Sequence, residues 1–140
     1  MGAKDPGGQG RPERPDRRGE RGREAERLAS GFLEARGLTV LARNHRSRGG
    51  EVDLVCQERE ELVFVEVRSR SSTDRGGPEE TVGVRKARRV VSAATDWALR
   101  NGGLDRPIRF DVVAITFGEG EPALEHFPAA FTADGQRSIW

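Results

Sequence analysis

Two carboxylates interrupt apolar segments near the middle of the chain. Asp53 lies within residues 50–55, GEVDLV, and Glu66 lies within residues 62–68, LVFVEVR. The β-branched and aromatic residues around them predict two β-strands. Burying a carboxylate is costly unless another group compensates its charge. We therefore expect Asp53 and Glu66 to be paired with basic groups, protonated, or bound to a cation.

The link between the two predicted strands is short enough for a hairpin, and the apolar pattern fixes how the strands pair. A slip of one residue would turn every side chain to the opposite face of the sheet. The register that avoids this places Asp53 opposite Glu66, where like charges are destabilising and a divalent cation would relieve the strain. The same register matches the apolar residues: Val52 with Val67, Leu54 with Val65, and Val55 with Phe64.

Side-chain alternation and the turn residues give two further expectations for this hairpin. Alternation places Val52 and Leu54 on one face of the first strand and Asp53 on the other. The turn falls near Arg59 and Glu60, which are not favoured in a two-residue hairpin turn. We therefore expect a loop of about four residues there.

The remaining elements follow from hydrophobic periodicity and from glycine stop signals. Residues 21–36 and 79–101 are predicted helices, and residues 38–44, 108–117 and 123–127 are predicted strands. The order helix, three strands, helix, strand predicts an α/β fold with helices packed on a mixed sheet. Residues 1–20 are rich in Gly, Pro and Arg and are expected to be a disordered tail. This leaves a folded domain at residues 21–131 and a C-terminal tail at residues 132–140.

Length and composition limit the class of protein. The 140 residues suit one domain, and 24 basic against 23 acidic residues give a net charge of +1, which does not by itself indicate a nucleic-acid partner. The single cysteine, Cys56, excludes an intrachain disulfide and fits a reducing compartment; we expect its thiol in the core. No apolar stretch approaches the roughly 18 residues of a membrane span, and no secretory signal is present. These features predict a cytoplasmic protein with no membrane partner.

Several segments together resemble the PD-(D/E)XK nuclease superfamily. In that superfamily an acidic residue ends one strand, an acidic-x-Lys triplet lies on the next, and a glutamate on the first helix often completes the site. The chain is still more similar to the YraN-like bacterial family, described as predicted endonucleases related to archaeal Holliday junction resolvases. The matching segments are residues 22–33, 50–54, 64–70, 82–86, 109–112 and 126–131. The resemblance implies a restriction-endonuclease-like α-β-β-β-α-β core.

The resemblance also implies roles for individual residues. Asp53 and Glu66 would bind Mg²⁺ or Mn²⁺, and Glu26 would be their helix-borne partner. The position of the superfamily's lysine is Arg68 here, and arginine cannot take up a proton. Arg68 can still stabilise negative charge developing on a phosphate. The implied activity is metal-dependent hydrolysis of phosphodiester bonds in DNA, with branched or structured DNA as the substrate by analogy, by a two-fold symmetric homodimer.

Basic residues near the carboxylates are candidates for contacts with nucleic-acid phosphates. They lie in the turn after the first strand, at the end of the acidic hairpin, and on the second helix: Arg46, Arg48, Arg70, Lys86 and Arg89. The two histidines, His45 and His126, lack zinc-ligand spacing and are expected on the surface or in loops. Asp111 is expected to be structural, paired with the neighbours of Arg109.

Alternatives to the metal site remain open at this point. Asp53 and Glu66 would also suit a solvated sheet face, paired with Arg68 and Arg70. Glu26 would suit an ordinary surface position near a helix N-terminus, where acids are favoured. At the level of the whole protein, the alternative is a non-catalytic nucleic-acid-binding or partner-docking module on a nuclease-like fold.

Overall fold

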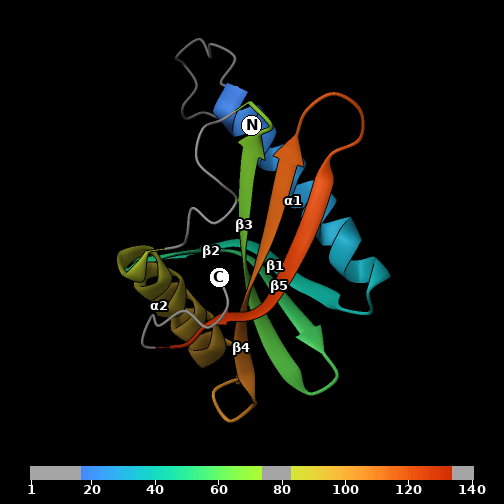
Figure 1. Ribbon diagram of the computed structural model, residues 1–140. Coiled ribbons are helices and arrows are strands. Elements are labelled where there is room, and N and C mark those ends of the chain that lie inside the picture. Colours follow the sequence, from blue (N-terminus) through green and yellow to red (C-terminus); the bar gives the residue numbers. More distant parts are fainter. Residues whose placement is uncertain (1–16, 74–82, 134–140) are drawn as a thin grey trace, which may run out of the picture.

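A five-stranded mixed sheet carries one helix on each face (Figure 1). This architecture is seen in a computed structural model, which describes residues 17–73 and 83–133. The elements in chain order are α1 (Arg17–Ala35), β1 (Thr39–Ser47), β2 (Gly50–Glu58), β3 (Glu61–Ser71), α2 (Val84–Arg100), β4 (Ile108–Phe117) and β5 (Ala123–Phe131). The predicted α/β fold with its α-β-β-β-α-β order is confirmed.

The strands lie in the sheet in the order of the chain, β1-β2-β3-β4-β5. Only β3 and β4 are parallel, and the other three neighbouring pairs are antiparallel. Parallel neighbours require a long connection, and α2 lies in the one between β3 and β4. Because of this crossover, α2 packs on the face of the sheet opposite α1 (Figure 1).

The predicted register of the β2–β3 hairpin is confirmed from Leu54 to the turn. The predicted match of Val52 with Val67 is wrong, because the two side chains pack on opposite faces of the sheet, and Asp53 and Glu66 are not among the paired residues of this hairpin. Leu54 lies opposite Val65 and Val55 lies opposite Phe64. The apolar residues of β3 also alternate as expected: those at 62 and 64 pack on the α2 side, and those at 63 and 65 pack on the α1 side. Glu66 therefore follows Phe64 on the face that α2 covers.

The turn of this hairpin is tighter than predicted. Glu58 pairs with Glu61, so Arg59 and Glu60 alone connect the strands, and the expected loop of about four residues is wrong. Arg59 adopts the left-handed region with φ 56°. Short hairpin turns need a positive φ to match the twist of their strands, and here an arginine supplies it in place of the usual glycine or asparagine.

The side-chain alternation of β2 breaks at Asp53, contrary to the prediction. Val52 packs in the core beneath α2, whereas Leu54 packs in the core beneath α1. Asn44 lies on β1 opposite Asp53, between residues paired with Val52 and Leu54, and it has φ 51°. Asparagine tolerates this left-handed conformation better than most residues. The irregularity sets Asp53 at the point where regular β2–β3 pairing ends.

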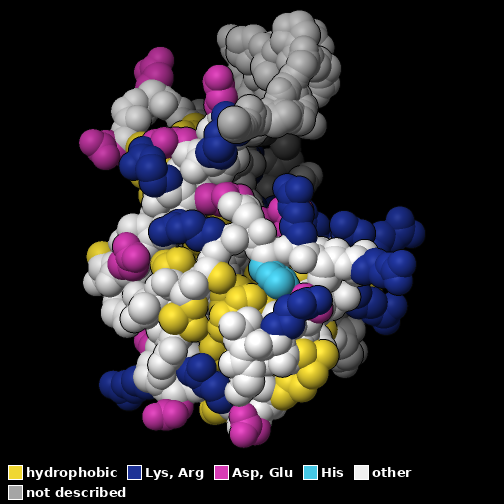
Figure 2. Space-filling model, turned by 180° about the vertical axis from the view of Figure 1, so that it is seen from behind, with side chains coloured by type: hydrophobic (Ala, Val, Ile, Leu, Met, Phe, Trp, Pro, Cys, Tyr) yellow, Lys and Arg dark blue, Asp and Glu magenta, His cyan; other side chains and the backbone are white. Residues whose placement is uncertain are grey.

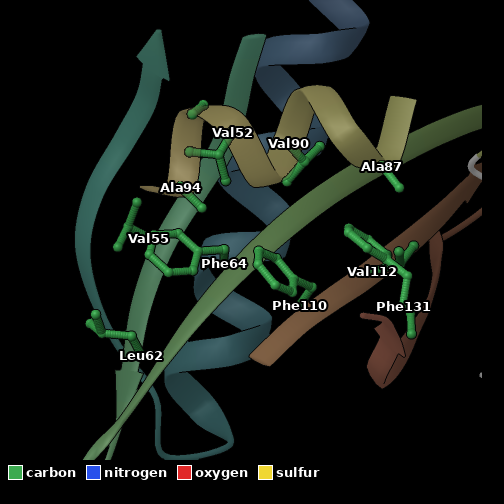
Figure 3. Packing of buried hydrophobic residues seen from close by; sticks show 12 residues of the cluster. Val52, Val55, Leu62, Phe64, Ala87, Val90, Ala94, Phe110, Val112 and Phe131 are labelled. Atoms are coloured by element: carbon green, nitrogen blue, oxygen red, sulfur yellow. The ribbon is translucent and has the colours of Figure 1, made fainter. Parts of the chain in front are cut away.

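The core beneath α2 is built around a row of aromatic rings (Figure 3). Phe64, Phe110 and Phe131 stack in sequence, with ring centroids 5.9 and 5.2 Å apart, and Trp97 meets Phe64 edge-on at 6.1 Å. Small and β-branched residues of α2, including Ala94 and Val90, lie over these rings (Figure 3). Each aromatic pair adds about 0.5–1.5 kcal/mol beyond its buried area, so this row anchors α2 to the sheet.

Several element boundaries differ from those predicted. α1 begins at Arg17 rather than at residue 21, β1 continues to Ser47 rather than ending at residue 44, and β5 continues to Phe131 rather than ending at residue 127. α2 begins at Val84, because Gly83 before it is extended with φ −69° and ψ 168°. Parts of the predicted tails and of the predicted second helix, residues 1–16, 79–82 and 134–140, lie outside the described residues.

No helix within residues 17–73 and 83–133 is long and apolar enough to cross a membrane.

Candidate active site

Asp53 and Glu66 face one open cavity of about 220 Å³, whose walls come from α1, β2, β3 and α2. Its charged lining residues are Glu26, Glu51, Asp53, Glu66, Lys86 and Arg89. Four carboxylates against two basic groups give this lining a formal excess of two negative charges. The residues that the resemblance singled out as an acidic site therefore do come together, two from the β2–β3 hairpin and one from α1.

Asp53 is held by the backbone of the neighbouring strand. Its Oδ2 accepts a hydrogen bond of 2.8 Å from the Val67 N–H, where a strand-to-strand bond would otherwise form. Burial and, to a smaller extent, the nearby Glu66 carboxylate together raise the pKa of Asp53 to about 8, against the opposing effect of the Val67 N–H. Asp53 is therefore mostly protonated at neutral pH when no cation is bound.

Glu66 is nearly inaccessible to solvent, with 5% of the residue exposed. Its Oε2 lies 3.1 Å from the Lys86 Nζ of α2. Burial raises the pKa of Glu66, while Lys86 and a hydrogen bond with Asp53 act to lower it. The alternative of a solvated sheet face is wrong for Glu66, and its ion-pair partner is Lys86, which the sequence indicated only as a phosphate-binding residue.

Glu26 reaches the cavity from α1, as the resemblance implied. Its Oε1 accepts a hydrogen bond of 3.1 Å from the Asn44 Nδ2. Asn44 is the left-handed residue opposite Asp53, so one residue of β1 both marks the break in the sheet and orients the helix-borne glutamate. Our sequence reasoning missed Asn44; the signal available was an asparagine in the middle of a predicted strand.

Arg68, at the position of the superfamily's lysine, is half-buried on β3 two residues beyond Glu66. Alternation puts both side chains on the same face of the strand. The positive charge of Arg68 is among the smaller influences that lower the pKa of Glu66. Arg68 is not among the residues that line the cavity, whereas Lys86 is. The structure therefore brings a lysine into the site from α2 rather than from β3.

The β1–β2 turn, Arg48 and Gly49, packs directly on α2. A Cβ added to Gly50 would lie 2.0 Å from the Arg89 carbonyl oxygen, and one added to Gly49 would lie 2.1 Å from the Ser92 Oγ. Only glycine permits this approach. The contact brings the exposed Arg48 of the turn next to the exposed basic residues of α2.

Besides Arg48, the basic residues predicted to contact phosphates fall into three groups. Lys86 and Arg89 line the cavity. Arg46 forms an ion pair with Glu51, with 3.5 Å between the arginine Nε and the glutamate Oε1. Arg70 is half-buried farther along β3. Lys and Arg side chains gather over the region of α2 at the right of Figure 2, where Arg85, Arg88 and Arg89 are exposed.

The pair of carboxylates suits a cation that needs few protein ligands. Within the described residues, no group of three or more His, Cys, Asp or Glu side chains is arranged to hold a metal ion. Mg²⁺ is commonly held by one or two carboxylates together with waters and substrate oxygens. Asp53 and Glu66 supply two oxygen ligands in an acidic, open cavity, so these residues fit Mg²⁺ and the similar Mn²⁺.

The histidines lie outside this cavity. His45 is half-buried and lies 2.8 Å from the Asp96 carboxylate of α2. The side chain of His126 is buried on β5, contrary to the expectation of a surface or loop position, and its Nε2 lies 2.8 Å from the Asp111 Oδ2. The Cys56 thiol is buried and its pKa is raised to about 12 by burial, as expected for a core residue.

Comparison with known proteins gives the family of the chain. The model of a family described as "Uncharacterised protein family UPF0102" matches residues 25–115. The chain belongs to this family. The UPF0102 match includes Glu26, Asp53, Glu66 and Lys86, and it confirms the resemblance to the YraN-like family at the level of the family.

Relatives in the UPF0102 family match most of the chain. The chain is 66% identical to a UPF0102 protein of Anaeromyxobacter dehalogenans over 119 residues, which are 85% of this chain and 89% of the relative. It is 60% identical over 131 residues to one of Anaeromyxobacter sp. (strain Fw109-5), covering 94% and 98%. A UPF0102 protein of Rhodococcus jostii is 43% identical over 111 residues, covering 79% and 94%.

Proposed function

We propose that this protein is a metal-dependent endonuclease that hydrolyses phosphodiester bonds in DNA. The observation that carries the proposal is the Asp53–Glu66 pair, a half-buried and a buried carboxylate that line the same open acidic cavity. Burial raises the pKa of both groups. Such an arrangement is unfavourable for a purely structural site and is typical of a functional one.

Asp53 and Glu66 would hold the cation, Mg²⁺ or Mn²⁺. When bound, the cation supplies an activated water and neutralises charge that builds on the phosphate. Glu26, fixed by Asn44, would orient water from the α1 side of the cavity. Arg68 would add positive charge behind Glu66, which favours the negatively charged transition state without exchanging a proton.

The basic surface beside the cavity supports a nucleic-acid substrate. Arg48 on the β1–β2 turn adjoins α2, where Lys86 and Arg89 face the cavity. Arginine and lysine bind phosphates without regard to base sequence. Arg46 and Arg70 would extend the same track. A surface of this kind recognises the backbone and its shape, which suits branched or structured DNA.

Two further expectations accompany this function. A branched junction presents two symmetric cleavage points, so a two-fold dimer is the expected active form. An enzyme that acts on chromosomal DNA and carries one buried thiol belongs in the cytoplasm.

The test is calorimetric titration of Mn²⁺ and Mg²⁺ into the pure protein, repeated with DNA present. We expect saturable binding that Asp53→Asn and Glu66→Gln abolish, because each substitution keeps the shape of the side chain and removes its charge. Asp105→Asn, an exposed residue of the loop after α2, is the control and should bind like the wild type. Labelled branched, flapped and single-stranded DNA then identifies the substrate. Absence of binding by the wild type, with and without DNA, would overturn the proposal.

A second candidate is a non-catalytic nucleic-acid-binding module, and Arg68 is the observation that favours it. DNA binding without cleavage of any substrate, in either metal, would support this candidate. Arg68→Lys distinguishes the two: a large gain in cleavage would show a nuclease limited by the missing lysine on β3.

A further inference from the structure

We propose that Lys86 is a tethered cation that neutralises Glu66 in the metal-free protein and moves to a substrate phosphate when a divalent cation binds. This inference rests on the proposed function. It gives Lys86 a role beyond general attraction of DNA, because its contact with substrate becomes conditional on the metal.

The contact itself is asymmetric. The Lys86 Nζ lies 3.1 Å from the Glu66 Oε2, yet 60% of the lysine side chain is exposed, against 6% of the glutamate side chain. Glu66 lies on β3, whose backbone pairs with β4 at this position, and only 5% of the residue is exposed. Lys86 is on the first turn of α2 and extends its stem through solvent. The lysine is therefore the partner that can leave.

A divalent cation would compete with Lys86 for the same carboxylate. An ammonium group and a metal ion at one buried oxygen repel each other strongly, because the local dielectric is low. When the metal binds, the repulsion favours release of the lysine. Its tether keeps the ammonium at the cavity that Lys86 and Arg89 both line. A phosphate that approaches the metal would then meet the released lysine.

The alternative cation, Arg68, does not fit this role. Arg68 is half-buried on β3 and is not among the cavity-lining residues. Its charge influences Glu66 less than the charge of Lys86 does. Arg68 therefore supplies a positive charge that stays in place, whereas the Lys86 side chain can move from Glu66 to a phosphate.

The first test measures Mn²⁺ affinity by calorimetry without DNA. Lys86→Met keeps the length of the side chain and removes the competing charge, so we expect Mn²⁺ to bind about 3- to 10-fold more tightly. Arg88→Met removes the same charge from the same helix outside the cavity, and it should change the affinity less than about twofold. Both substituted positions are exposed, and thermal melts would verify that both variants fold.

The second test measures DNA affinity with and without Ca²⁺, which occupies carboxylate sites. Lys86→Met should weaken DNA binding about fivefold or more with Ca²⁺ and less than about twofold without it. Arg88→Met should weaken binding by the same factor in both conditions, because its side chain makes no contact that depends on the metal.

The outcomes separate this inference from the proposed function. Unchanged or weaker Mn²⁺ binding by folded Lys86→Met would overturn the displacement of Lys86 while leaving the nuclease proposal intact. An equal loss of DNA affinity with and without Ca²⁺ would do the same. If the wild-type protein binds no metal, even with DNA, the proposed function fails and this inference fails with it.

Discussion

Two acidic sites lie on the same sheet, and the surroundings of their carboxylates differ in opposite directions. Asp111 on β4 is fully buried and accepts hydrogen bonds from Arg109, from His126 and from the Ala129 N–H. The Asp53–Glu66 pair has two carboxylates for one lysine and one backbone N–H. Asp111 has more hydrogen-bond donors than its single charge requires, whereas Asp53 and Glu66 together have fewer.

The pKa values express this difference. Burial acts to raise the pKa of Asp111, but the hydrogen bonds from His126, Arg109 and Ala129 outweigh it and the pKa is lowered. Burial raises the pKa of both Asp53 and Glu66, and the few donors there do not compensate. A satisfied buried acid stabilises a fold, whereas an unsatisfied one marks a place where a ligand supplies the missing charge.

The largest expected effect on stability comes from removing Asp111, the buried acid whose charge is compensated by hydrogen bonds. Asp111→Ala leaves His126 and the Ala129 N–H without their buried acceptor, so we expect a loss of about 2–5 kcal/mol in the free energy of unfolding. Arg109 keeps its ion pairs with Glu58 and Glu61 in this variant. Urea denaturation measures the loss, with the exposed Asp105→Ala as control. A loss below about 1 kcal/mol would show that the cluster is not structural.

A smaller loss in the free energy of unfolding is expected from changing Gly50, where β2 packs against α2 beside the Asp53–Glu66 pair. In Gly50→Ala the added Cβ clashes with the Arg89 carbonyl oxygen and displaces α2 from β2, at a cost of about 1–3 kcal/mol. Because Lys86 is on α2, Mn²⁺ affinity should change as well. Gly31→Ala on α1 is the matched control: no atom lies within 4 Å of its added Cβ, and a helix gains stability from the change. Equal stability of the two variants would contradict the packing argument.

Removing the charge of Asp53 should stabilise the folded state, whereas the two preceding substitutions destabilise it. Asp53→Asn relieves its repulsion with Glu66, so we expect the folded state to gain about 1–2 kcal/mol near pH 8 while metal binding is lost. Thermal melts and calorimetry on the same sample measure both. If Asp53→Asn instead lowers the stability, then Asp53 stabilises the fold as Asp111 does, and the contrast between the two acidic sites is wrong.

The pH dependence of stability gives the finest distinction. The folded pKa of Asp53, about 8, exceeds its ordinary value of 3.8, so its contribution is greatest below about pH 4 and is lost as the pH rises to about 8. The pKa of Asp111 is lowered, so its contribution is present at neutral pH and is lost only as the pH falls below 3.8.

Urea denaturation between about pH 5 and pH 8.5 separates these contributions. Wild-type stability should decline across this range, and Asp53→Asn should flatten the decline. Saturating Mn²⁺ should raise the wild-type melting temperature more at the upper end than at the lower, because it stabilises the ionised carboxylates. A wild-type curve that rises with pH would contradict the raised pKa of Asp53.

Much of this arrangement follows from the sequence by short-range rules. The β2–β3 register could be predicted because strand alternation and short hairpin links act over few residues, so Leu54 meets Val65 as expected. The fold class followed from the order of the elements. Asp111 was expected to be structural and to pair with the neighbours of Arg109, but its partner is Arg109 itself, two residues away.

The missed features depend on contacts between distant segments or on unusual backbone conformations. Lys86 reaches Glu66 only because the connection through α2 returns over the sheet, which no local pattern specifies. His126 meets Asp111 through a β4–β5 register that shifts between residues 110 and 112. The turn at Arg59 and the kink at Asn44 both use positive φ at residues other than glycine.

The hydrogen bond from the Val67 N–H to Asp53 makes one backbone amide a natural spectroscopic reporter of the site. The chemical shift of an amide proton depends on whether its acceptor is a neutral carboxyl or a carboxylate. The Val67 resonance should therefore move with the protonation of Asp53 and respond when a cation or a DNA strand arrives, so one peak in an NMR spectrum would follow occupancy of the site in solution.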